Sequence, residues 1–232
     1  MPPCLRFDPP TADRRCTCTG RWRPAWHGPP GSDVDLLTVG PAPAGAAEIA
    51  RDLSVRFSEL SRGVAIAAAR HSDFSREDEE GYGGRVFLKH YCVHLTGPDL
   101  HSALPDFAAD ARAARGFNGD IARHVERWRR ELHDDADPVQ LGRCVARKTL
   151  FAVAGLVSVH DGTWTTDRAT AAARRAEIEP STADDLSMLL SWSHVEASPD
   201  RVAVGAALAG AVARITASFA RSIGLWSSDE GP

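Results

Sequence analysis

Two aspartates at the entry of an apolar segment place the strongest constraint on how this chain folds. Asp33 and Asp35 precede the apolar run Leu36–Val39, and Gly31 and Ser32 come before them. If the run is a β-strand, both carboxylates point to the same side, because side chains alternate along a strand. Two acids on one face repel each other and are costly to bury unless a cation lies between them. Mg²⁺ would suit this position, since proteins usually hold it with one or two carboxylates plus substrate phosphates.

A plainer interpretation fits the same residues. Gly31, Ser32 and Asp33 can form a turn, and an ordinary strand can follow with its acids exposed to water. Spacing alone leaves both interpretations open.

The first half of the chain has the pattern of a small α+β domain. Residues 34–39 predict a strand, and apolar residues recur every three or four positions over 44–61, which predicts an amphipathic helix. The apolar run 64–68 predicts a second core strand. Gly-rich residues 81–84 predict a turn, and the β-branched and aromatic residues of 85–95 predict a further strand.

The second half follows helical spacing to its end. Helices are predicted over 107–114, 121–132, 139–160, 167–177 (capped by Thr166 or Asp167), from 180 onward, and over 202–225. Four or five of these six segments are expected to form a helical bundle. The expected organisation is therefore α+β: an irregular leader at 1–30, a small mixed-sheet domain at 31–104, and an α-helical bundle at 105–228.

The segment Gly-Ser-Asp-Val-Asp-Leu-Leu at residues 31–37 resembles the core motif of the nucleotidyltransferase superfamily. That superfamily includes DNA polymerase beta and the aminoglycoside adenylyltransferases. Its motif is a Gly-Ser turn, a gap of roughly ten residues, and then Asp-hydrophobic-Asp-hydrophobic. The segment Leu-Thr-Gly-Pro-Asp-Leu at 95–100 and the helical stretch 147–167 are also similar to the aminoglycoside enzymes. The resemblance covers about residues 31–225.

The resemblance implies Mg²⁺-dependent transfer of a nucleoside monophosphate, with AMP from ATP as the expected donor, to a hydroxyl of a small molecule or protein. It makes Asp33 and Asp35 the catalytic, metal-binding pair, and Gly31, Ser32 and Lys148 the residues expected to bind the nucleotide. The expected partners are the nucleotide and a small-molecule acceptor.

Two departures from the family pattern favour an alternative. The place of the phosphate-binding Gly-Ser turn ahead of the Asp pair reads Thr-Gly-Arg-Trp at 19–22, so Arg21 replaces the serine. The predicted strand at 64–68 also lacks the third carboxylate that should face the first two. The alternative is a catalytically degraded homologue that acts as a nucleotide-binding or protein-interaction module, akin to an antitoxin.

Charge, hydropathy and cysteine content limit the functional classes and cellular compartments that fit this chain. The formal net charge of −4 argues against a general nucleic-acid binder, which would carry a basic face. The sequence contains no run of about 18 apolar residues, so no membrane-spanning helix is predicted. The five cysteines lack the spacing of a disulfide framework, which favours a reducing, cytoplasmic compartment. Cys16, Cys18 and His27 match no common zinc pattern, and the oligomeric state stays open.

Overall fold

The structure is a computed structural model that describes residues 17–20, 33–40, 43–165, 167–194 and 196–226. The chain divides into two compact units. Unit 1 comprises Met1–Ser75 with Phe87–Pro105, and unit 2 comprises Arg76–Val86 with Asp106–Pro232. The predicted α+β class is confirmed, with far more helix than strand.

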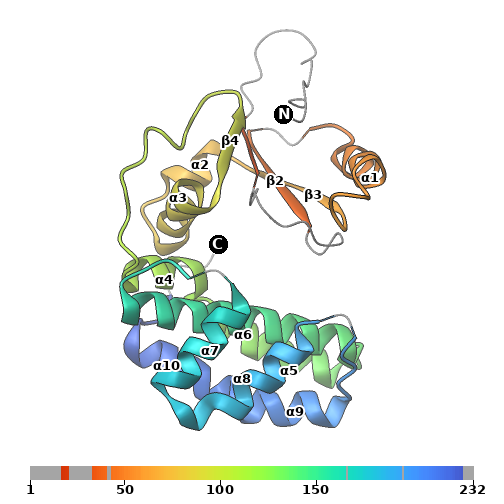
Figure 1. Ribbon diagram of the computed structural model, residues 1–232, viewed down its shortest axis with the longest axis vertical. Helices are drawn as coiled ribbons and strands as arrows, with labels where there is room; N and C mark the ends of the chain where they lie inside the picture. Colours follow the sequence, from red (N-terminus) through yellow and green to blue (C-terminus); the bar gives the residue numbers. More distant parts are fainter. Residues whose placement is uncertain (1–16, 21–32, 41–42, 166, 195, 227–232) are drawn as a thin grey trace. The chain divides into compact units, whose positions relative to one another are not determined.

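Unit 1 contains a four-stranded mixed sheet (Figure 1). Its strands are β1 (Thr17–Gly20), β2 (Val34–Val39), β3 (Val64–Ala69) and β4 (Val93–Thr96). They lie in the order β3-β2-β1-β4. β2 pairs in parallel with β3, whereas β1 is antiparallel to both β2 and β4.

Helix α1 (Ala46–Arg56) connects the two parallel strands, as the sequence predicts. Parallel neighbours need such a crossover, because a short turn cannot return the chain to the same end of the sheet. Leu53 is buried on this helix. The next residue, Ser54, accepts a hydrogen bond from the backbone N–H of Val64 at 2.8 Å, which ties the helix to the start of β3.

The strand predicted over 85–95 is wrong for most of its length. After the short helix α2 (His71–Ser75), helix α3 runs from Glu79 to Tyr91, and only β4 is extended. The expected turn at 81–84 lies inside α3. A Cβ built on Gly83 would lie 2.4 Å from the carbonyl oxygen of Gly116, so the glycine allows close backbone contact with a second helix.

The four residues of β1 also differ from the expected irregular leader. They lack a local strand pattern, yet they pair with β2 on one side and β4 on the other. Cross-strand pairing of this kind depends on distant segments and leaves little trace in the local sequence. The rest of the predicted leader, including Cys16 and His27, lies outside the described residues.

The described part of unit 2 contains seven α-helices after α3, more than the four or five expected. They are α4 (Ala111–Asn118), α5 (Ile121–His133), α6 (Pro138–Asp161), α7 (Arg168–Ile178), α8 (Ala183–Trp192), α9 (Arg201–Ala209) and α10 (Ala211–Ser222). The predicted helix over 202–225 is divided at Gly210, whose φ of −105° and ψ of −95° are not helical.

The core of unit 2 forms around α6, the longest helix (Figure 1). Its buried side chains include Val145, Leu150 and Val153, and they belong to one apolar cluster with Trp128 of α5 and Phe219 of α10. Burial of apolar area of this kind is the main favourable contribution to folding.

Aspartates begin four of these helices by accepting backbone N–H groups of the first turn. Asp110, Asp137, Asp167 and Asp200 accept from the residues two or three positions on, at 2.9, 3.1, 2.8 and 2.7 Å. Such caps satisfy N–H groups that have no partner within the helix. One of the two predicted caps of α7, Asp167, is thereby confirmed; Thr166 lies outside the described residues.

The Arg201–Ser222 stretch is long and apolar enough to cross a membrane by length and composition alone. In the structure it is the α9–α10 pair, and Val204, Leu208, Val212 and Phe219 are buried in the core of unit 2. Core helices commonly pass the same test.

The Gly83–Gly116 contact predicts that Gly83→Ala destabilises the protein by about 1–3 kcal/mol, because the new methyl group meets backbone rather than a movable side chain. Chemical denaturation followed by circular dichroism measures this. The matched control is Gly205→Ala on α9, where the nearest atom to an added Cβ is 3.6 Å away. That substitution should stabilise by up to about 1 kcal/mol through helix propensity. Equal effects at both positions would contradict the close-contact explanation.

Candidate functional site

The two aspartates lie where the sequence predicts, at the entry of β2. Asp33 immediately precedes the strand and Asp35 is its second residue, so both carboxylates are on one side of the sheet. Both side chains are exposed. The Cα partner of Asp35 on β3 is Ala65, and Ala65 and Ala67 are exposed as well, as expected for residues of the same face.

The Asp33 carboxylate is held by an arginine that the sequence analysis did not single out. Arg62 donates from Nε to Oδ1 at 3.0 Å and from Nη2 to Oδ2 at 2.5 Å, a two-bond ion pair. The side chains are 47% and 43% exposed, respectively. The hydrogen bond to Asp33 raises the pKa of Arg62, and the negative charge of Asp33 acts in the same direction. The guanidinium therefore stays protonated.

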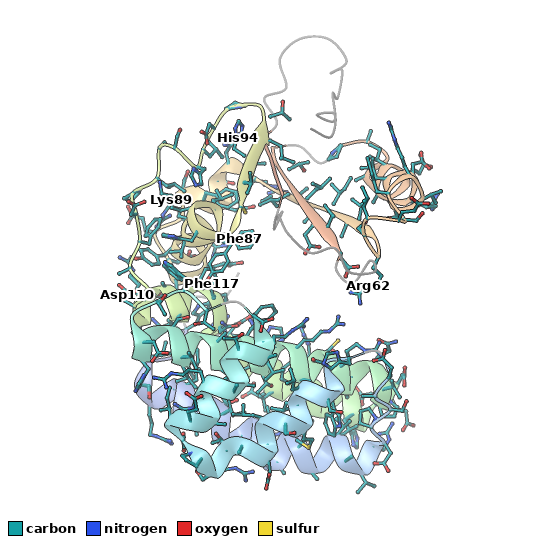
Figure 2. All side chains as sticks on the ribbon, viewed as in Figure 1. Arg62, Phe87, Lys89, His94, Asp110 and Phe117 are labelled. Atoms are coloured by element: carbon teal, nitrogen blue, oxygen red, sulfur yellow. The ribbon has the colours of Figure 1, made fainter. Side chains whose placement is uncertain are left out.

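The backbone around Arg62 is fixed on both sides. Ser61 is buried, and its N–H donates to the carbonyl of Phe57 at 2.9 Å. Gly63 accepts from the N–H of Val34 at 2.8 Å, which joins the loop to the start of β2. Figure 2 shows Arg62 at the end of the sheet where β2 and β3 begin. The parallel pairing thus brings Arg62 to Asp33. A prediction that β2 and β3 pair in parallel would have identified this arginine from the sequence.

Asp35 has a different environment. Within the described residues, no hydrogen bond or ion pair joins its carboxylate to another side chain or to the backbone. The described part of the chain also holds no group of three or more His, Cys, Asp or Glu residues placed to bind a metal ion. The donor set is therefore two exposed carboxylates.

Such a donor set fits Mg²⁺ and does not fit zinc. Zinc sites in proteins need three or four nitrogen, sulfur or oxygen ligands from side chains. Mg²⁺ keeps several waters and accepts phosphate oxygens alongside one or two carboxylates. Asp33 and Asp35 are the residues that would hold it, provided that Arg62 releases part of the Asp33 carboxylate.

Gly31 and Ser32, the predicted nucleotide-binding residues ahead of the pair, lie outside the described residues, as does Arg21. The strands on either side of these residues are described. Gly20 ends β1, and its Cα partner is Leu36 of β2. Because β1 and β2 are antiparallel, the chain leaves β1 at the same end of the sheet at which Asp33 enters β2.

Lys148, the third predicted nucleotide-binding residue, belongs to unit 2 and is bonded there. Its Nζ lies 2.8 Å from Asp120 Oδ1 and donates to the carbonyl oxygen of Phe117 at 3.2 Å. The side chains of Lys148 and Asp120 are each 21% exposed. These contacts connect α6 with the end of α4 and with the segment that joins α4 to α5, and the nucleotide-binding role of Lys148 stays a prediction.

A histidine completes this cluster. His124 Nε2 lies 2.9 Å from Asp120 Oδ2, and Arg127 Nη2 lies 2.8 Å from His124 Nδ1. Burial lowers the pKa of His124, and the charges of Lys148 and Arg127 act in the same direction, against the opposing charge of Asp120. The available sequence signal was the i,i+4 spacing of Asp120, just before a predicted helix, and His124 within it.

The lowered pKa of His124 predicts a loss of stability in mild acid. Below the ordinary pKa of 6.5 the unfolded chain binds a proton that the folded state disfavours, so the free energy of unfolding falls as pH decreases from about 6.5. His124→Gln should flatten this slope, measured by denaturation between about pH 7 and pH 5. His133→Gln, at an exposed position of the same helix, is the control. A wild-type slope in His124→Gln would contradict the assignment.

Neither a scan against protein-family models nor a search of curated proteins finds a match to this chain.

Proposed function

We propose that this protein is a nucleotidyltransferase that transfers a nucleoside monophosphate, AMP from ATP in the first instance, to a hydroxyl of a small-molecule or protein acceptor. The observation that carries the proposal is the pair of exposed carboxylates at the entry of β2. The strand lies between an antiparallel neighbour and a parallel one in a mixed sheet. The resemblance of residues 31–37 to the superfamily motif supports the same assignment.

In this proposal each residue has a limited task. Asp33 and Asp35 hold Mg²⁺, which would neutralise phosphate charge when bound. Gly31 and Ser32 contribute backbone N–H groups and a hydroxyl to the phosphates. The acceptor oxygen forms a bond to the α-phosphorus, the bond from that phosphorus to the bridging oxygen breaks, and pyrophosphate leaves. The proton of the acceptor hydroxyl passes to a general base, and no described residue is assigned that role.

A second candidate function is a nucleotide-binding or interaction module without transfer activity. Two observations favour it. Arg62 already neutralises Asp33, and β3 presents Ala65 and Ala67 on the face where the family pattern expects a third carboxylate. A site with two acids can bind a metal–nucleotide complex, yet it has one group fewer to carry out the chemical step.

Substitution of either aspartate tests the proposal. Asp33→Asn and Asp35→Asn should each weaken binding of ATP in the presence of Mg²⁺ by about tenfold or more, because each removes a charged ligand. Isothermal titration calorimetry measures the affinity. The control is Asp52→Asn, at an exposed position of α1 in the same unit, which should bind as the wild type does.

Transfer is measured separately, with ATP labelled at the α-phosphate and a panel of hydroxyl acceptors. Label in an acceptor, lost in both aspartate variants, would establish the transferase. Binding without transfer would favour the second candidate. No binding of ATP by the wild type, or equal binding by all variants, would refute both the transferase and the nucleotide-binding module.

A further inference from the structure

We propose that Arg62 is a phosphate-binding residue of this site, which pairs with Asp33 in the absence of ligand and exchanges that carboxylate for nucleotide phosphate oxygens when a metal–nucleotide complex binds. The inference rests on the proposed function and assigns a specific residue to nucleotide binding. It starts from the two hydrogen bonds of the Arg62–Asp33 pair.

The position of Arg62 is set by the fold. β2 and β3 are parallel, and Val34 is the Cα partner of Val64, so the residues just before each strand lie side by side. Asp33 is the residue before β2, and Gly63, the residue before β3, directly follows Arg62. A Cβ built on Gly63 would lie 3.7 Å from Asp33 Oδ1, which keeps the loop backbone close to the carboxylate. A cation that is anchored here stays within reach of any ligand of Asp33.

Separating the Arg62–Asp33 ion pair also costs little free energy. Both side chains are close to half-exposed, so water can solvate each charge as the ion pair opens. Exposed ion pairs contribute little to stability, because solvent screens them and holding two long side chains costs entropy. The backbone bonds of Ser61 and Gly63 do not involve the guanidinium, so Arg62 can change rotamer while the loop stays in place.

The chemistry of the guanidinium fits both partners. Its planar array of donors matches two oxygens of a carboxylate or of a phosphate with the same geometry. When the Asp33 carboxylate becomes a metal ligand, its oxygens are less available to Arg62. The phosphates that accompany the metal then offer new acceptors at the same place.

This exchange predicts opposite changes in two affinities. Arg62→Ala should bind Mn²⁺ alone about threefold more tightly than the wild type, because a competing cation has been removed from Asp33. The same variant should bind ATP, at saturating Mg²⁺, about tenfold more weakly, because a charged phosphate ligand has been lost. Arg62→Lys should fall between, since it keeps the charge without the two-bond geometry. Titration calorimetry measures both affinities.

The control is Arg51→Ala on the exposed side of α1, which removes an arginine of the same unit away from Asp33. It should leave both affinities unchanged. If Arg62→Ala weakens both ligands in parallel, Arg62 is only a structural clamp; if it changes neither, the pair is irrelevant to binding. Either result overturns the exchange while the proposed function survives. A wild type that binds neither Mn²⁺ nor ATP overturns both.

Discussion

The parallel pairing of β2 with β3 determines what the acidic end of the sheet can do. It places Asp33, just before β2, beside the loop that leads into β3, and that loop carries the oppositely charged Arg62. The pairing depends in turn on the α1 crossover, with Leu53 buried and Ser54 bonded to the start of β3. The pairing of positive and negative charge at the candidate site therefore depends on how the α1 crossover packs.

Unit 2 handles its charges differently. Lys148 and Asp120 are largely buried beside a histidine whose pKa is lowered by burial, and they join α6 to the segment between α4 and α5. Removing one member of such a pair leaves the other charge partly buried without compensation, which is costly. The Asp33–Arg62 pair is far more exposed, so it can open at little cost. This difference in burial separates a pair suited to structure from one suited to ligand exchange.

The sequence predicted those helices and strands whose conformation depends mainly on the residues of the same segment. The apolar runs predicted β2 and β3, and the helical spacing of the second half predicted most of its helices; α4 begins and ends about four residues later than expected, and the last helix is divided at Gly210. The failures depended on distant partners. Gly83 is helical because Gly116 packs against it, and β1 is a strand because β2 and β4 pair with it. Arg62 was missed for the same reason, since 29 residues separate it from Asp33.

The identity of Asp35 gives the strongest reason to regard this end of the sheet as a binding site. Aspartate is unfavourable within a strand, and here it faces alanines rather than a cation of the described chain. The ion pair with Arg62 gives Asp33 a structural role, because the two side chains connect the start of β2 with the loop before β3. Among the residues that the structure describes, none makes a comparable contact with Asp35. Under the proposed function, a hydrated divalent cation that carries phosphates would account for both residues, because such a cation is held by one or two carboxylates.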